Sequence, residues 1–399
     1  MTVHANDKRR APLILLALTL TIAACGDDDG VSPTQQGPVP ADFSTYVALG
    51  NSLTAGYQSA GINDSTQRES YAVLVAQSMG LTVGTGFTYP SLAGLGCTPP
   101  IVNIFTGERV GGGLATDCFG RVDGALPHNV AVPGAAVIDL SSNTDARSNA
   151  NPLTTLFLGG LTQLAAAAQL QPTFVSAWIG SNDVLAAALN GDASLITDFD
   201  QFKADLDIVV RAIDDMNPTG AILIGVPNVL SIPNLSPGAA YWVGAQLGLL
   251  PPGVTVAANC ATAEFGGVGE TTLVPFAWGF GVIFATGGTL DCVADAAVVN
   301  AFELVQILAA VGRFNTAIER EATARGWAYL DPNILLDSIR ATGEIPLFPN
   351  TSGLDALISP FGKWFSRDGF HINGAANVLI AAHVIDAINA TYSTSLPRP

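Results

Sequence analysis

Residues 46–56 read YVALGNSLTAG, and this stretch decides the fold because an apolar run in it ends in a turn of small residues. Tyr46 to Leu49 predict a buried strand, and Gly50 to Gly56 predict a tight turn that opens a helix. Such a junction presents Ser52 at the end of a strand, where a nucleophile would be exposed. Because a serine hydroxyl is a weak nucleophile by itself, this interpretation also requires a base, a group that orients the base, and oxyanion donors.

His371 is the strongest candidate for the base. The chain has four histidines, and His4 lies in a segment that we expect to be removed. Residues 368–371 read DGFH and precede a predicted helix over residues 374–390. Residues three apart lie on the same side of a helix or turn, so Asp368 can fix the tautomer of His371. His128, before a predicted strand, and His383, within the predicted helix, are weaker alternatives.

Two further predicted strands end in residues that suit an oxyanion hole. Residues 129–135 read NVAVPGA, and the missing Cβ of Gly134 lets its backbone N–H approach an oxyanion closely. Residues 174–183 read FVSAWIGSND, and the side-chain amide of Asn182 is a natural second donor. Taken singly, each segment is also compatible with an ordinary strand-to-helix turn.

In this order, the four segments resemble the four sequence blocks of the SGNH hydrolases, the superfamily of GDSL esterases and lipases, over residues 45–390. The resemblance implies that Ser52 is a nucleophile and that Asp368 and His371 complete a triad. It implies an oxyanion hole formed by the backbone N–H groups of Ser52 and Gly134 with Asn182. The activity it implies is that of a serine carboxylic-ester hydrolase, which works through an acyl-enzyme and uses no cofactor and no metal.

The chain departs from the family pattern at two positions. Asn51 stands where an aspartate is usual before the nucleophile, which keeps a hydrogen-bonding side chain but removes a charge. We expect this change to retune activity rather than abolish it. Pro133 replaces a small residue and removes a backbone donor, but not the donor of Gly134. The competing α/β-hydrolase motif Gly-x-Ser-x-Gly is disfavoured, because Thr54 occupies the place of its second glycine.

Strands and helices alternate along the chain, which predicts an α/β fold. Strands are expected near residues 46–49, 129–132, 173–179, 221–226 and 328–330. An amphipathic helix that ends before Asn217 and Pro218 is expected to carry Phe199, Phe202, Leu206, Val209 and Ile213 on one face. Another is expected over residues 302–325 with Gly326 as its C-terminal cap. On the helix over residues 374–390 the expected apolar face is Val378, Leu379, Ala382, Ile385 and Ile388. This alternation predicts a parallel, flavodoxin-like sheet covered by helices on both faces, as three α/β/α layers, with ligands beyond the carboxyl ends of the strands.

Two insertions near residues 83–123 and 231–299 exceed this minimal pattern, and each contains two cysteines. Sequence proximity favours disulfides between Cys97 and Cys118 and between Cys260 and Cys292, although four cysteines allow three pairings. Metal binding is the alternative, but no CxxC or paired histidines support it. The second insertion is rich in aromatic residues between Tyr241 and Phe284. It is interpreted either as a cap that lines an acyl-binding cleft or as a satellite core.

The N-terminal segment predicts export and lipid anchoring. Residues 1–24 combine three basic residues with a short apolar stretch, as in a signal peptide, and the small residues before Cys25 resemble a lipobox. A plain secretory signal is the alternative. Residues 25–40 form an acidic and Pro-rich flexible tether before a hydrolase domain over residues 41–395. We therefore expect lipidation at Cys25 and attachment to the bacterial cell envelope, in the outer membrane, facing either the periplasm or the surface.

Composition excludes one class of partner. Residues 1–24 hold three basic residues and one acidic residue, which leaves 13 basic and 32 acidic residues and a formal charge of −19. Nucleic acid is therefore not an expected partner. Hydrophobic residues make up 49% of the chain and charged residues 12%, which fits one large, well-buried domain.

Three functional hypotheses follow, and for an enzyme the ester substrate is expected to be either lipid-like or an acylated glycan. The first is a lipase-like or lysophospholipase-like enzyme on apolar acyl esters. The second is a carbohydrate O-acetyl esterase, and the third is a non-catalytic surface binding lipoprotein. The intact set of Ser52, Asp368 and His371 argues against the third hypothesis.

Overall fold

A parallel sheet forms the centre of the computed structural model, which describes residues 41–399. Its strand order is β1 (Tyr46–Gly50), β4 (Phe174–Trp178), β5 (Gly220–Ile224) and β10 (Ala328–Leu330), and all neighbours pair in parallel. Every residue of β1, β4 and β5 is buried. A parallel sheet covered on both faces needs apolar side chains on both sides, which is why these strands are continuous apolar runs.

The predicted strand over residues 129–132 occupies the expected place beside β1 but is not a regular strand. Val130 N–H donates to the Ala48 carbonyl at 3.0 Å and Val132 N–H to the Gly50 carbonyl at 3.2 Å, yet only Ala48 and Asn129 form a bridge. The pairing stops because Pro133 has no N–H and Gly134 turns the chain away with φ +87°. With this edge segment counted second, the sheet has the flavodoxin-like order 2-1-3-4-5.

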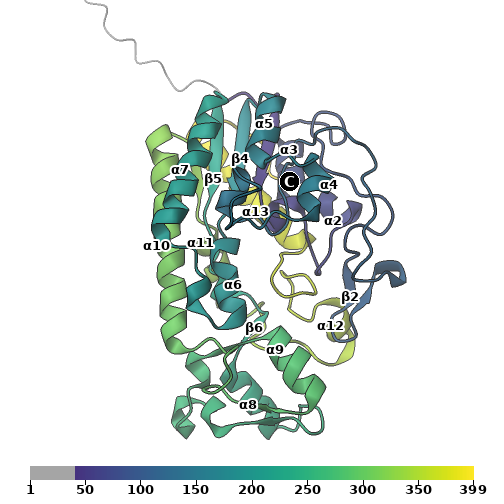
Figure 1. Ribbon diagram of the computed structural model, residues 1–399, viewed down its shortest axis with the longest axis vertical. Helices are drawn as coiled ribbons and strands as arrows, with labels where there is room; N and C mark the ends of the chain where they lie inside the picture. The colour runs from purple at the N-terminus through teal and green to yellow at the C-terminus, as the bar shows by residue number, and fades with distance from the viewer. Residues whose placement is uncertain (1–40) are drawn as a thin grey trace, which may run out of the picture. The chain divides into compact units, whose positions relative to one another are not determined.

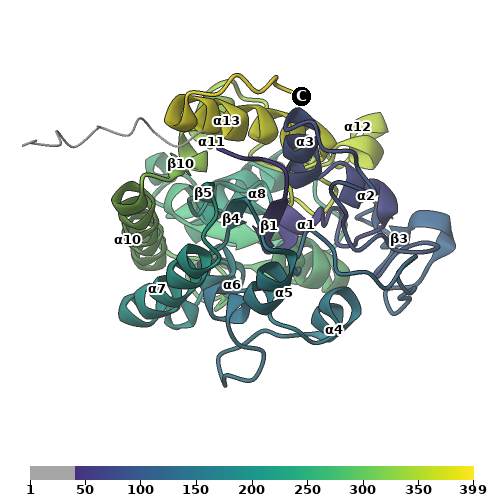
Figure 2. The same ribbon diagram turned by 90° about the horizontal axis from the view of Figure 1, so that it is seen from above.

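Helices cover both faces of the sheet, as Figure 2 shows. One layer contains α3 (Tyr71–Ser78), α11 (Pro332–Ala341) and α13 (Gly374–Tyr392). The opposite layer contains α5 (Gln163–Leu170), α6 (Asn182–Asn190), α7 (Phe199–Asp215) and α10 (Ala301–Arg325), and Gly326 caps α10 in the left-handed conformation as predicted. The predicted three-layer α/β/α class is therefore confirmed.

The buried face of α13 agrees only in part with the expected one: Ile385 and Ile388 are buried as expected, whereas Leu379 and Ala382 are only partly buried. Val378 is 43% exposed, and the buried residues are Ala376, Asn377, Ile380, Ala381, Val384, Ile385, Ile388 and Tyr392. Apolar residues lie on every side of this helix, so periodicity alone does not single out one face.

Short elements complete the described chain. The helices are α1 (Ser52–Ala55), α2 (Asp64–Arg68), α4 (Pro152–Leu158), α8 (Gly238–Gln246), α9 (Phe276–Trp278) and α12 (Gly353–Ile358). The short strands pair as β2 (Ile101–Asn103) with β3 (Glu108–Arg109), β6 (Leu235–Pro237) with β8 (Leu273–Pro275), and β7 (Thr255–Val256) with β9 (Thr289–Leu290). The predicted signal peptide, tether and Cys25 lie outside the described residues.

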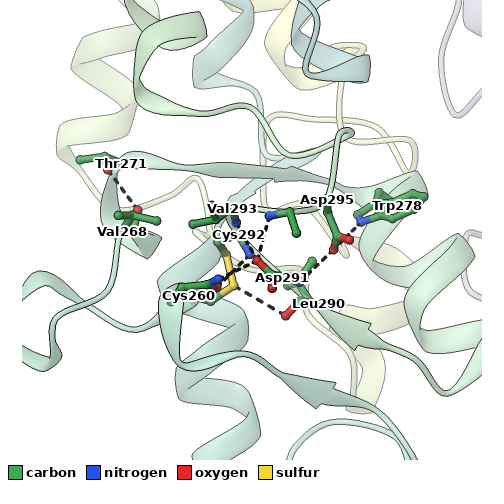
Figure 3. Close-up of a disulfide and its surroundings, with 11 residues drawn as sticks. Cys260, Val268, Thr271, Trp278, Leu290, Asp291, Cys292, Val293 and Asp295 are labelled. Carbon is green, nitrogen blue, oxygen red and sulfur yellow. Dashed lines mark hydrogen bonds between the residues drawn. A yellow bond between two sulfur atoms is a disulfide. The ribbon is translucent and has the colours of Figure 1, made fainter.

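Both predicted disulfides are present. Cys97 is bonded to Cys118 in the first insertion, and Cys260 to Cys292 in the second. Next to the second disulfide, Asp295 accepts hydrogen bonds from the Trp278 indole at 3.2 Å and from the Asp291 N–H at 2.9 Å (Figure 3). The disulfide and these bonds hold the second insertion together.

The second insertion lies beyond the carboxyl ends of the sheet strands, around α8 and α9 in Figure 1. Much of its aromatic content forms a satellite core. Tyr241 is fully buried, and its ring contacts Phe280, Phe284 and Phe348. A separate hollow of about 600 Å³ lies between the two insertions, and its walls include Phe105, Leu249, Leu250, Phe276, Phe280 and Phe284. The satellite-core interpretation therefore holds for Tyr241, whereas other aromatic residues of the second insertion, among them Phe276, line an open hollow.

Candidate active site

The turn after β1 presents Ser52 as the first residue of α1. Asn51 caps this helix, because its Oδ1 accepts a hydrogen bond from the Leu53 N–H at 3.0 Å. The first N–H of a helix has no intrahelical partner, and the Ser52 N–H has none among residues 41–399. Gly50 is required at the end of β1, because a Cβ there would clash with the Thr54 hydroxyl and lie 2.6 Å from the Trp178 carbonyl oxygen. The turn therefore leaves both the hydroxyl and the N–H of Ser52 available.

Ser52, His371 and Asp368 form a continuous hydrogen-bonded chain. His371 Nε2 lies 2.9 Å from Ser52 Oγ, and His371 Nδ1 lies 2.7 Å from Asp368 Oδ2. The His371 side chain is 13% exposed, and that of Asp368 is 2% exposed. With a proton on Nδ1, Nε2 is free to accept the Ser52 proton, which is the arrangement that a general base requires.

Asp368 is held by five hydrogen-bond donors. Oδ1 accepts from the Ser366 hydroxyl at 3.0 Å, the Phe370 N–H at 3.0 Å and the His371 N–H at 2.9 Å. Oδ2 accepts from the Ala60 N–H at 2.7 Å and from His371 Nδ1. Burial alone would raise the pKa of Asp368, but the His371 charge and these hydrogen bonds outweigh it and hold the pKa below its usual value. Asp368 therefore stays ionised, as an orienting carboxylate must.

Gly134 lies on a loop that turns away from the sheet edge. Its φ of +87° is one that L side chains rarely adopt, and its N–H has no partner among the described residues. Asn151 fixes this loop, because its side-chain amide donates to the Pro133 carbonyl at 2.9 Å. Gly134 is half-buried, so its N–H is available as a donor.

Asn182 begins α6, directly after β4. One N–H of its side-chain amide donates to the Ala135 carbonyl at 2.8 Å, which links Asn182 to the Gly134 loop and leaves the other N–H without a partner among residues 41–399. Gly180 makes the sharp turn ahead of it with φ +106°, where a Cβ would lie 2.7 Å from a Val226 methyl carbon. Ser52, Gly134 and Asn182 thus all follow the carboxyl ends of sheet segments, as predicted for a shared site.

Asp183 adds a buried carboxylate behind this loop. It is 3% exposed, and its Oδ2 accepts a hydrogen bond from the Val137 N–H at 3.0 Å. Burial is the main cause that raises the pKa of Asp183 to about 7; the hydrogen bond from Val137 lowers the pKa, and the nearby charges of Asp139 and Asp205 add to the increase. Asp183 therefore supports the loop at Val137 and is sensitive to pH near neutrality.

Two residues that contact the site carry no motif in the sequence. The side chain of Gln163 bonds both backbone groups of Gly50, at 2.9 and 2.8 Å. Asn234, in the second insertion, donates from its side chain to the Asp368 carbonyl at 2.8 Å and from its backbone to the Gly369 carbonyl at 3.0 Å. Each contact joins segments more than 100 residues apart, and no local pattern signals it.

The alternative histidines lie elsewhere. His128 Nδ1 is 2.9 Å from the Thr88 hydroxyl, and burial lowers the pKa of His128. His383 lines a different hollow with Tyr329 and Asp331. Within residues 41–399, no three His, Cys, Asp or Glu side chains are grouped to hold a metal ion.

An apolar pocket of about 80 Å³ is lined in part by residues that are next to Ser52 and His371 in the sequence. Its walls include Leu53, which follows Ser52, and Phe370 and Ile372, which flank His371. The remaining walls are almost entirely apolar and come mainly from α11, α13 and the segment before the Asp368 turn: Trp178, Pro227, Ile232, Pro332, Leu335, Leu336, Ile339, Ile345, Trp364, Phe365, Ala376, Leu379 and Ile380. The second insertion contributes only Ile232 to this pocket.

Comparisons with known proteins give similarity at the level of solved structures only. No protein-family model matches the sequence, and no curated protein matches it. A catalytic mutant of Axe2, an acetylxylan esterase from Geobacillus stearothermophilus, is similar with 10% identity over 91% of this chain and 100% of that chain, at a TM-score of 0.39. The acetyl xylan esterase AlAXEase has 13% identity over 86% of this chain and 99% of its own, at 0.35. LAE5, an alpha/beta hydrolase enzyme from the metagenome of Lake Arreo in Spain, has 13% identity over 90% and 98%, at 0.37.

Proposed function

We propose that this protein is a serine carboxylic-ester hydrolase of the SGNH type that works through an acyl-enzyme. The observation that carries the proposal is the chain of two hydrogen bonds, 2.9 Å from Ser52 Oγ to His371 Nε2 and 2.7 Å from His371 Nδ1 to Asp368 Oδ2. A binding protein has no need of a base on a serine hydroxyl or of a buried carboxylate behind that base.

In the proposed reaction, Ser52 Oγ attacks the ester carbonyl carbon while His371 Nε2 takes the hydroxyl proton. The negative charge that develops on the carbonyl oxygen is stabilised by the N–H groups of Ser52 and Gly134 and the side chain of Asn182. His371 then gives its proton to the leaving alcohol, which leaves an ester on Ser52. Water, deprotonated by His371, attacks that ester and releases the acid.

Turnover of p-nitrophenyl butyrate by Ser52→Ala and His371→Ala tests the proposal. Each variant should lose several orders of magnitude in kcat, because triad members act as a unit. His383→Ala is the matched control, since its histidine lines a different hollow, and it should retain wild-type kcat. Near-wild-type turnover by a folded Ser52→Ala protein would exclude the proposed role of Ser52.

For the substrate we propose an ester with an apolar acyl chain, which would lie in the pocket beside Leu53, Phe370 and Ile372. The support for this choice is the chemistry of the pocket, whose walls are almost entirely apolar and include the neighbours of Ser52 and His371 in the sequence. Each methylene that leaves water can contribute up to about 0.8 kcal/mol, or roughly fourfold in kcat/KM. Preference should therefore rise from acetate towards medium chains until the pocket is full.

A pair of variants locates the acyl chain. Leu336→Trp fills the pocket next to Leu53, whereas Leu250→Trp fills the hollow between the insertions. Only Leu336→Trp should shorten the preferred chain on a series of p-nitrophenyl esters. If Leu250→Trp shortens it instead, the acyl chain lies against the second insertion. A steep preference for acetate in the wild type, unchanged by either variant, would favour a carbohydrate O-acetyl esterase.

We further propose export and lipid anchoring at Cys25. This proposal rests on the N-terminal sequence alone, where a basic and apolar segment of 24 residues ends before Cys25. The mature protein should carry acyl mass on Cys25 and partition into detergent, whereas Cys25→Ser should be released in soluble, active form. A mature N-terminus at any other residue would contradict the proposal.

A further inference from the structure

Two consecutive residues near the triad adopt a conformation that L-amino acids avoid. Ser59 has a φ of 54° and Ala60 a φ of 49°, and neither is glycine. They form the turn between Gln58 and Gly61, which pair with each other through N–H···O bonds of 2.9 and 3.1 Å. Left-handed conformations of non-glycine residues persist only where their surroundings hold them, and they cluster at functional sites.

The N–H groups of this turn face the Asp368 turn. The Ala60 N–H donates to Asp368 Oδ2 at 2.7 Å, on the same oxygen that contacts His371 Nδ1. The Ser59 N–H donates to the Ser366 hydroxyl at 2.8 Å, and that hydroxyl lies 3.0 Å from Asp368 Oδ1. Both donors of the strained turn therefore act on the carboxylate of the triad, directly or through one hydroxyl.

The carbonyl groups of the same turn face the first insertion. The Ser59 carbonyl accepts from the Ile101 N–H at 2.7 Å, and the Ala60 carbonyl accepts from Arg109 Nη1 at 3.0 Å. Arg109 Nη1 also donates to the Pro99 carbonyl at 2.6 Å. Among the described residues Arg109 has no carboxylate within ion-pair distance. Its guanidinium group instead donates hydrogen bonds to the backbone carbonyls of Ala60 and Pro99.

We propose that Arg109 is a positioning residue for the triad, an inference that rests on the proposed function. The hydrogen bond from Arg109 fixes the position of the Ala60 carbonyl. Because this carbonyl belongs to the strained turn, the bond also fixes the turn, and the turn directs the Ala60 N–H toward Asp368 Oδ2. The disulfide between Cys97 and Cys118 closes the segment that carries Pro99 and Arg109. The first insertion is therefore a support for the orienting carboxylate.

The test compares Arg109→Leu, Arg109→Lys and a matched control, with active sites counted by fluorophosphonate titration. Removing Arg109 should lower kcat on p-nitrophenyl butyrate about tenfold with KM within about twofold, because a hydrogen bond to an ionised group is weakened. Arg109→Lys keeps a cationic donor and should restore most of kcat. Arg121→Leu is the control: Arg121 lies in the same insertion and donates to the Phe157 carbonyl at 2.9 Å, away from the triad. It should lower Tm and leave kcat unchanged.

A double variant separates positioning from general stability. Glycine adopts a left-handed conformation without strain, so Ala60→Gly should restore part of the kcat lost in Arg109→Leu. An unchanged kcat in Arg109→Leu, or an equal loss in Arg121→Leu, would overturn the inference. If Arg109→Leu yields too little folded protein, a kcat loss in Arg109→Lys that Ala60→Gly does not relieve would overturn it too. Ser52→Ala is measured in parallel. If Ser52→Ala is inactive and Arg109→Leu is fully active, only the positioning role is rejected. If Ser52→Ala is active, the proposed function itself is rejected.

Discussion

Replacing Asp368 by asparagine tests whether the carboxylate orients His371, because the substitution keeps the size and shape of the side chain but changes its hydrogen bonding. The carboxylate meets three donors at Oδ1 and two at Oδ2. A carboxamide must put its NH₂ at one of these positions. At the Oδ1 position it would oppose the N–H groups of Phe370 and His371. At the Oδ2 position it would oppose only the Ala60 N–H, provided that His371 Nδ1 becomes an acceptor.

The second arrangement is the less costly one, and it moves the His371 proton from Nδ1 to Nε2. In that tautomer Nε2 cannot accept the Ser52 proton, so the base is lost although every atom stays in place. A change of this kind lowers kcat by about 10⁴-fold. One pair of donors left facing each other should also lower the free energy of unfolding by about 1–3 kcal/mol.

The assay is kcat on p-nitrophenyl butyrate, with Tm measured on the same preparations. We expect Asp368→Asn to remain folded and to lose about four orders of magnitude in kcat. A kcat within tenfold of the wild type would refute the assignment of Asp368 as the group that fixes the His371 tautomer. Such a result would leave the five hydrogen bonds with a structural role only.

Three further outcomes are expected. Asn182→Ala should lower kcat by roughly 10² to 10³ with little change in KM, because one oxyanion donor is removed, and a silent substitution would count against that role. Asn51→Asp should keep kcat within tenfold, since the acceptor for the Leu53 N–H is retained and the replaced Nδ2 has no partner among the described residues; inactivation would show that the amide is required. Burial raises the pKa of Asp183 from 3.8 to about 7, so this side chain costs the fold up to about 4 kcal/mol as pH rises from 4 to 8. Asp183→Asn keeps an acceptor for the Val137 N–H and should lose that pH dependence in denaturant titrations, whereas identical pH profiles would contradict the raised pKa.

The elements that the sequence places correctly are those marked by local patterns. Buried parallel strands are continuous apolar runs. Ser52, Gly134 and Asn182 follow such runs, and Asp368 and His371 lie shortly before the start of α13. Local patterns alone therefore suffice to place Ser52, Gly134 and Asn182 at one edge of the sheet. The cysteine pairs are also predictable, because each pair lies within one short insertion.

The residues that the sequence does not reveal act through long-range contacts. Ala60 contacts Asp368 across 308 positions, and Asn234 contacts it across 134. The turn at Ala60 contacts Asp368 Oδ2 only through a backbone N–H, and no periodicity or motif in the sequence indicates such a contact. The aromatic residues of the second insertion show the converse problem, because an apolar sequence indicates burial but does not distinguish a satellite core from the wall of a cleft.

The most direct test of the proposed mechanism is to trap the covalent intermediate and locate it. The wild-type protein is mixed with p-nitrophenyl butyrate, quenched in acid within milliseconds, and examined by intact mass and peptide mapping. We predict a butyryl group on Ser52, a stoichiometric burst of p-nitrophenol, and neither of these in Ser52→Ala. Turnover without any acyl adduct, or an adduct on a residue other than Ser52, would contradict nucleophilic catalysis by Ser52.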